Sequence, residues 1–278
     1  MQEAAQNPVT PRPALRQGGA QVRFDWGLTG ALALTQRPAT AAVVVDVLSF
    51  STSVSVAGDL GIETFPFRWR DARATEFAKS MDATLAGGRR QGRPSLSPAS
   101  IRAAAWRAPS AAAEPHRRPA PSRLVLPSPN GSSICLTLAE QAIPVLAGCL
   151  RNATAIAHWL AHALATGRLA AVGIVAAGER WPDGSLRPAA EDLWGAGAVL
   201  ARLAATAPEL RVSPEARAAA AAFSAVEPDL AQQLAGCASG LELVEDGFAE
   251  DVTIAAELDG SSVVPLLLRD RFEPQHTP

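Results

Sequence analysis

The stretch that decides the fold is residues 41–58, which read AAVVVDVLSFSTSVSVAG. Its valine run, Val43 to Val45, is typical of a strand that is covered on both faces. Asp46 ends the run, and serine and threonine residues follow where a helix can begin, because their side chains cap free N–H groups. Those N–H groups carry partial positive charge, so a carboxylate beside them is a place where a metal and a phosphate can meet. The alternative interpretation is an ordinary strand, turn and helix with a capping aspartate.

Composition limits the class of protein. The chain has 278 residues, 48% of them hydrophobic, which is enough for one or two domains with a large core. A net charge of −2 and a pI of about 6.1 give no reason to expect nucleic-acid or membrane partners. Cys135, Cys149 and Cys237 are widely spaced and form no CxxC pair, which fits a reducing compartment. With no basic, apolar leader at the N-terminus and no apolar run of about 18 residues, we expect a cytoplasmic protein.

Strand and helix patterns alternate along most of the chain. This alternation predicts an α/β fold, a three-layer αβα sandwich with a largely parallel or mixed central sheet. We expect a disordered tail over 1–19, a single domain over 20–270 with a flexible insertion over 106–122, and a tail over 271–278. The predicted strands are 21–26, 43–45, 62–66, 83–86, 123–126, 144–147, 171–176, 252–256 and 263–267. The predicted helices include 71–81, 100–105, 153–165, one opening after residue 190, two within 214–236, and one over 240–245.

Polar residues gather where the predicted strands end. Active sites of open α/β sheets lie at the carboxyl ends of strands, so these residues are the candidates for chemistry. They are Asp46, Asn130, Gly131, Ser132, Ser133, Arg151, Asn152, Glu179, Arg180, Glu191, Asp192, Asp251, Glu257 and Asp259. Carboxylates are Mg²⁺ ligands, whereas helix N-termini and arginines hold phosphate oxygens. The set indicates phosphoryl transfer to water, although each member alone could be a cap, a turn or a strand-end charge.

Two further motifs are better explained by structure. His158 and His162 have the spacing of a zinc helix but lack the glutamate of HExxH, so we expect a solvent or packing role. Gly195 and Gly197 resemble a nucleotide turn, yet they lie inside the helix that Glu191 opens, so close helix packing is the better account.

Five blocks of sequence resemble the 2-phosphosulfolactate phosphatase family. They occur in the family's order and span most of the chain between residues 21 and 268. The blocks are VVVDVLSFSTSV from Val43, LPSPNGS from Leu126, AGCLRNA from Ala147, AAGER with EDLWGAGAV between Ala176 and Val199, and EDVTIAAELDGSSVVPLL from Glu250.

The resemblance implies an Mg²⁺-dependent phosphatase that converts (R)-2-phospho-3-sulfolactate to sulfolactate and phosphate, a step toward coenzyme M. We therefore assign metal binding to Asp46, Glu191 and Asp192. Catalytic roles are assigned to Asp46, Asn130, Arg180 and Glu191. Substrate contacts are assigned to Ser51, Thr52, Ser53, Gly131, Ser132, Arg151 and Asn152, with the two arginines chosen on charge and position. The expected partner is a small phosphorylated acid, and a homodimer stays open.

The chain departs from the family pattern in three places, one of which is the insertion over 106–122, rich in proline, alanine and arginine. The turn after Asp46 has Ser49-Phe50-Ser51 where Arg-Ala-Thr is usual, and the loop from Ala86 to Pro98 is rich in arginine where the family is acidic. Our hypothesis is that Arg89 or Arg90 replaces the missing positive charge in space. Alternatives are a phosphatase for another small phosphorylated acid and a non-catalytic anion-binding homologue. A dinucleotide enzyme is disfavoured because no GxGxxG follows an early strand.

Overall fold

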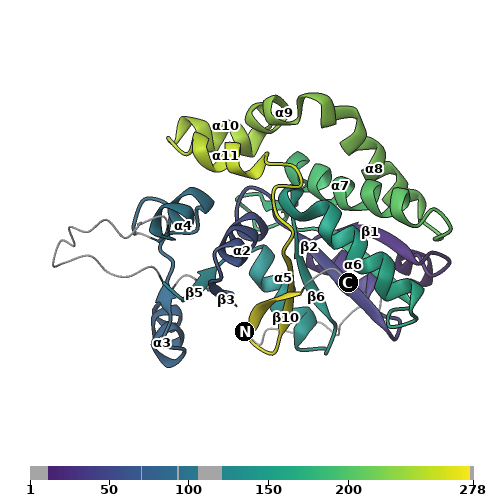
Figure 1. The fold of residues 1–278 in the computed structure, drawn as a ribbon, viewed down its shortest axis with the longest axis horizontal. Coiled ribbons are helices and arrows are strands. Elements are labelled where there is room, and N and C mark those ends of the chain that lie inside the picture. Colours follow the sequence, from purple (N-terminus) through teal and green to yellow (C-terminus); the bar gives the residue numbers. More distant parts are fainter. Residues whose placement is uncertain (1–11, 70, 93, 106–120, 276–278) are drawn as a thin grey trace, which may run out of the picture.

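The structure is a computed structural model that describes residues 12–69, 71–92, 94–105 and 121–275 (Figure 1). Most of the predicted insertion over 106–122 therefore lies outside the described residues, as do residues 1–11 of the predicted N-terminal tail. None of the described helices is long and apolar enough to cross a membrane.

A mixed sheet of nine strands runs through the molecule. Its order is β1-β7-β2-β6-β10-β11-β3-β5-β4, with β10 and β11 antiparallel to each other and to their outer neighbours and the remaining pairs parallel. Its strands are β1 (Val22–Trp26), β2 (Thr40–Val45), β3 (Glu63–Phe67), β4 (Thr84–Leu85), β5 (Arg123–Pro127), β6 (Val145–Gly148), β7 (Ala171–Ala176), β10 (Val264–Leu268) and β11 (Arg271–Gln275). A separate hairpin joins β8 (Glu179–Arg180) to β9 (Leu186–Arg187).

Helices cover both faces of this sheet, and Figure 1 shows α8 to α11 continuing as an arc along one side of the molecule. The α-helices are α1 (Gly27–Leu34), α2 (Phe50–Asp59), α3 (Ala72–Ser80), α4 (Pro98–Ala105), α5 (Gly131–Ala139), α6 (Ala153–Ala165), α7 (Ala190–Thr206), α8 (Pro214–Val226), α9 (Leu230–Gly236), α10 (Ala238–Glu245) and α11 (Ala249–Ala255). Short 3₁₀ helices are η1 (Pro13–Arg16), η2 (Leu150–Asn152) and η3 (Glu227–Asp229).

Strand β2 lies at the centre of the layers because both of its faces are apolar. Val43 and Val45 belong to the core cluster that also contains residues of α6 and α7. Ala42 and Val44 belong to the opposite cluster, which contains residues of α1, α2 and α5. Successive side chains of a strand point to opposite faces, so a valine run can serve two cores at once. The prediction of a three-layer α/β fold is confirmed.

Close packing explains the two glycines of α7. A Cβ atom at Gly195 would lie 2.4 Å from a methyl carbon of Val47, and one at Gly197 would lie 2.2 Å from the carbonyl oxygen of Ala219 in α8. The packing interpretation of this motif is confirmed.

Three local predictions are wrong. Residues 252–256 were expected as a strand, but Val252 lies in α11, where Glu250 and Asp251 occupy the first turn and stabilise a helix N-terminus. The predicted tail from 271 contains β11, an interior strand of the sheet, despite Pro274 within it. In the predicted N-terminal tail, η1 is ordered, and the Gln17 side chain exchanges hydrogen bonds of 2.7 and 3.2 Å with the backbone of Phe24.

Candidate active site

Asp46 lies at the carboxyl end of β2, between the N-termini of α2 and α5. One carboxylate oxygen accepts the Phe50 N–H at 3.2 Å, and the other accepts the Gly131 N–H at 3.0 Å. The Ser128 hydroxyl lies 3.4 Å from the second oxygen. Two helix N-termini thus point partial positive charge at one carboxylate.

Glycine is required at position 131 for this approach. A Cβ atom there would lie 2.5 Å from the Phe50 ring and 2.7 Å from the Asp46 carboxylate. The N-terminus of α5 can therefore reach Asp46 because this residue has no side chain.

Burial raises the pKa of Asp46, and the charge of Glu191 raises it further. The backbone N–H groups of Phe50 and Gly131 and the charge of Arg89 act in the opposite direction. A carboxylate that loses water needs such compensation to stay charged.

Asp192 joins the ends of two neighbouring strands. Its carboxylate accepts the Val47 N–H at 2.7 Å and the Gly178 N–H at 2.8 Å. Val47 follows β2 and Gly178 follows β7, so Asp192 fixes both loops from the first turn of α7. Burial, together with the charges of Asp46 and Glu191, raises its pKa well above the ordinary value.

Glu191 lies beside Asp192 at the start of α7 and is buried. The Cys237 thiol, between α9 and α10, donates to its Oε2 over 3.5 Å. Burial and the nearby Glu191 carboxylate raise the pKa of Cys237 to about 12, so its thiol keeps its proton. The turn between α9 and α10 therefore contacts the Glu191 side chain through Cys237, whose one thiol proton also lies within reach of the Leu234 carbonyl at 3.2 Å.

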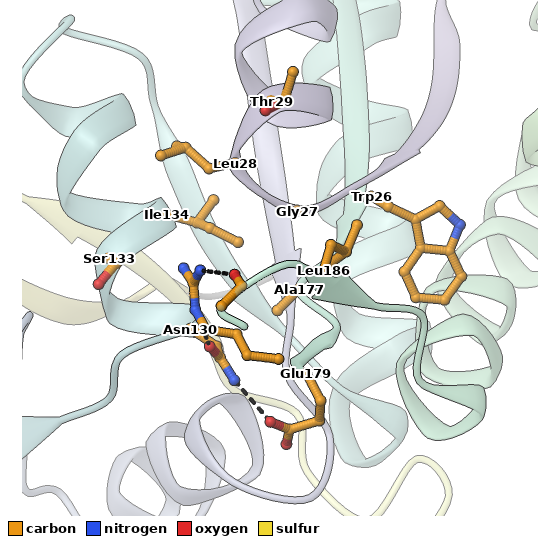
Figure 2. A pocket seen from close by; sticks show the side chains of 12 residues that line it. Trp26, Gly27, Leu28, Thr29, Asn130, Ser133, Ile134, Ala177, Glu179 and Leu186 are labelled. Atoms are coloured by element: carbon orange, nitrogen blue, oxygen red, sulfur yellow. Dashed lines mark hydrogen bonds between the residues drawn. The ribbon is translucent and has the colours of Figure 1, made fainter. Parts of the chain in front are cut away.

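A cavity of about 340 Å³ is lined by Asn130 and Glu179, whereas Asp46, Glu191 and Asp192 are not among its lining residues. Figure 2 shows Asn130 and Glu179 turned toward each other on one side of it, and Nδ2 of Asn130 donates to Oε2 of Glu179 at 2.9 Å. Arg180 donates from Nε to Oδ1 of Asn130 at 3.3 Å and from Nη1 to the Gly184 carbonyl at 3.0 Å. The remaining wall is mostly apolar and includes Trp26, Leu28, Ile134, Ala177 and Leu186.

Glu179 is the carboxylate among the residues that line the cavity. Burial, followed by the charges of Asp46 and Glu191, raises its pKa to about 7, although Arg187 and the hydrogen bond from Asn130 lower it. Its protonation therefore changes near neutral pH. The mutual charge effects place Asp46, Glu179, Glu191 and Asp192 in one electrostatic group.

Comparison with known proteins gives the family. A family model described as 2-phosphosulpholactate phosphatase matches residues 29–270. The chain belongs to this family. Membership supports a phosphatase, a hydrolase that takes a small phosphorylated substrate. No curated protein matched the chain in a sequence search.

Three of the four serine and threonine residues that were predicted to contact substrate donate hydrogen bonds to backbone carbonyls. The Ser51 hydroxyl donates to the Asp46 carbonyl at 2.8 Å, and the Thr52 hydroxyl donates to the Val47 carbonyl at 2.6 Å. The Ser132 hydroxyl donates to a carbonyl of β5 at 3.0 Å. Ser53 is buried, and its hydroxyl has no partner among the described residues.

Arg151 and Asn152 are likewise occupied by the protein. Arg151, with a side chain 2% exposed, makes ion pairs with Asp59 and Glu257. Asn152 accepts the N–H of Cys149 at 2.9 Å and donates to carbonyls of residues 147 and 263. The structure places both residues in loop support, so we leave them out of the proposed substrate contacts.

The donor chemistry fits Mg²⁺. In the described ranges 12–69, 71–92, 94–105 and 121–275, no three or more His, Cys, Asp and Glu side chains form a metal-holding group. Mg²⁺, however, commonly uses one or two carboxylates and completes its shell with water and substrate phosphate. Asp46 and Glu191 match that pattern, since both are buried carboxylates whose charges repel each other. Asp46 and Asp192 each direct both oxygens to backbone N–H groups, and the metal roles of Asp46, Glu191 and Asp192 all stay predictions.

Several site residues were absent from the sequence prediction or were given no role in it. Ser128 lies in the LPSPNGS block, two positions before Asn130, and could have been chosen on that ground. Glu179 appeared among the strand-end residues without a role. Cys237 and Trp26 gave no sequence signal, because their approach to the site depends on how separate helices and strands pack.

Proposed function

We propose that the protein is an Mg²⁺-dependent phosphatase for a small anionic phosphomonoester, with (R)-2-phospho-3-sulfolactate as the first candidate substrate. The observation that carries the proposal is the position of Asp46. This buried carboxylate lies between two helix N-termini, one of which begins at Gly131, directly after Asn130 of the cavity wall, in a chain that belongs to a phosphatase family.

Asp46 and Glu191 would hold the metal in this proposal. When bound, Mg²⁺ supplies positive charge that offsets both carboxylates and the phosphoryl oxygens and makes phosphorus more electrophilic. Asp192 keeps the loops after β2 and β7 in register, and the N-terminus of α5 at Gly131 presents N–H groups to the same region.

Asn130, Glu179 and Arg180 would orient the ester in the cavity. Asn130 is held at both ends of its amide, by Glu179 and by Arg180, so its orientation is set before substrate binds. Glu179 in its protonated form can donate to an oxygen of the leaving group, and Arg180 can pair with an anionic group of the acid.

A family member acting on a different phosphorylated acid is the second candidate. Most of the described cavity wall is apolar, and Arg180 is the cation among those lining residues. With the phosphate at the proposed metal, this wall offers a single arginine to a second anionic group of the substrate. This wall favours an acid that carries a hydrocarbon portion beside its phosphate.

The test measures phosphate release from sulfonated, carboxylated and alkyl-substituted phosphomonoesters, with Mg²⁺ and with EDTA. We expect activity that EDTA removes and added Mg²⁺ restores. Asp46→Asn should lower turnover roughly 1,000-fold or more. Asp82→Asn is the matched control, because Asp82 is exposed with φ 48°, a conformation that asparagine also adopts. Full activity in EDTA would contradict the metal, and full activity in Asp46→Asn would contradict the site.

A further inference from the structure

The candidate site collects negative charge, and a phosphate ester adds more. Asp46, Glu191 and Asp192 are buried together, and Glu179 interacts electrostatically with all three. Helix N-termini and one metal ion offset part of this charge. A fixed cation near Asp46 would offset more of it, because a full positive charge acts strongly where water is scarce.

Arg89 is such a cation. It lies in the loop between β4 and α4, 43 positions from Asp46 in sequence order, yet it reaches the turn that follows Asp46. Its Nη2 donates to the carbonyl of Leu48 at 2.7 Å. Leu48 lies in the turn between Asp46 and Phe50, so the guanidinium reaches the turn that ends at Phe50, whose N–H group binds the Asp46 carboxylate.

The guanidinium is held in place by a buried acid. Asp251, with a side chain 2% exposed, accepts Nε of Arg89 at 2.9 Å. Asp251 is itself fixed by the Ser97 hydroxyl at 2.6 Å and the Ala99 N–H at 3.2 Å. The Cζ atom of Arg89 lies 5.9 Å from the centroid of the Phe248 ring. An arginine oriented from several sides loses little conformational freedom when it binds an anion.

The neighbouring arginine has a different environment. Arg90 pairs with Asp246 at 2.6 Å, and both side chains are exposed, 69% and 55%. Arg89, by contrast, has a side chain that is 20% exposed. Of the two arginines in our hypothesis, Arg89 is therefore the one that faces the Asp46 turn.

We propose that Arg89 is the arginine that contacts the phosphoryl group at Asp46, and that Asp251 positions it. The proposal rests on the proposed function. A guanidinium has five N–H groups, and within the described residues two hydrogen bonds engage Arg89, from Nε and from Nη2. The N–H groups that remain match the oxygens of a phosphate, which arginine binds through two parallel hydrogen bonds.

The experiment compares Arg89→Met with Arg90→Met, which removes the same charge one residue away. Inorganic phosphate is the probe, and calorimetry with Mg²⁺ measures its binding alongside kcat and KM for the best ester. We expect Arg89→Met to weaken phosphate binding roughly 10- to 100-fold and to lower kcat/KM at least as much. Arg90→Met should stay within about twofold of wild type. Added guanidinium ion should restore part of the activity that Arg89→Ala has lost. It should not increase the activity of wild type or of Arg90→Met.

Arg89→Lys is the control for loss of folding, because lysine keeps the positive charge but lacks the two parallel N–H groups of the guanidinium. This variant should fold and bind phosphate more weakly than wild type. Asp251→Asn should raise KM more than it lowers kcat, because the Arg89 guanidinium keeps its charge but is held less firmly in its orientation. Phosphate binding within about twofold of wild type in Arg89→Met would overturn the proposal, as would an activity loss with unchanged phosphate binding and no guanidinium rescue. If wild type binds phosphate but hydrolyses no ester, the proposed function fails and Arg89 is still judged by phosphate binding. If wild type binds no phosphate, the Arg89 proposal fails as well.

Discussion

Replacing Glu179 by glutamine should stabilise the metal-free protein, and more at pH 8 than at pH 5.5. Folding raises the pKa of this carboxyl from its ordinary value of 4.5 to about 7. Between these two values the unfolded chain has already lost the proton that the folded protein retains. Rising pH therefore favours the unfolded chain until the folded pKa is passed, and the destabilisation is then constant.

The size of the effect follows from the two pKa values. At about 1.4 kcal/mol for each pH unit, the difference between 4.5 and about 7 destabilises the fold by roughly 3 kcal/mol at pH 8. At pH 5.5 the same relation gives about 1.4 kcal/mol. Glutamine cannot ionise, and its carbonyl can still accept the hydrogen bond from Asn130. The gain in unfolding free energy should thus be about 2 kcal/mol larger at pH 8.

Urea unfolding followed by circular dichroism in EDTA measures this difference. The matched control is Glu209→Gln, since Glu209 is exposed before α8 and the same substitution there should leave stability within about 0.5 kcal/mol. Equal stability of wild type and Glu179→Gln at both pH values would refute the reasoning, because burial and the neighbouring carboxylates would then not act on Glu179. A gain that is larger at pH 5.5 would refute it too.

Two further substitutions test the packing and the ion pairs. Gly197→Ala should lower the free energy of unfolding by about 1–3 kcal/mol, because its Cβ would lie 2.2 Å from the Ala219 carbonyl oxygen. Gly236→Ala is the control and should be near neutral, because nothing lies within 4 Å of a Cβ atom there. Urea unfolding measures both variants, and equal stabilities would contradict the packing argument. Arg151→Met should lower the free energy of unfolding by about 1–3 kcal/mol and lower Tm, because Asp59 and Glu257 lose this partner although Glu257 keeps Arg102. KM should stay unchanged, and a raised KM at unchanged Tm would instead return Arg151 to the substrate contacts.

Much of the fold could be predicted because local pattern and final structure agree. The helix over 153–165 and the strand over 171–176 end where the sequence predicts, since apolar spacing and flanking residues point to the same elements. β-branched residues such as Val252 and Ile254 are typical of strands and a proline such as Pro274 is unusual inside one, yet Val252 and Ile254 lie in α11 and Pro274 lies in β11. Packing against neighbouring elements decided both.

The candidate site divides in the same way. Asp46, Asn130 and Asp192 could be found because parallel strands bring their carboxyl ends to one edge of the sheet. The direction of each polar side chain could not be found. Ser51 and Asn152 hydrogen-bond to the backbone of their own loops, and no pattern of spacing distinguishes such a bond from a contact with substrate.

The negative charge around Asp46 exceeds the positive charge that the protein places there. Burial favours the neutral acid, and two helix N-termini together with Arg89 favour the carboxylate, yet the pKa is still raised. Glu179 and Asp192 show the same direction, so the local positive charge does not balance the group of carboxylates. Further positive charge at this edge of the sheet would lower all three pKa values together, because each carboxyl is affected by its neighbours. Divalent metal should therefore bind more tightly as pH rises through 7, with protons released on binding, and a pH-independent affinity would contradict this account of the site.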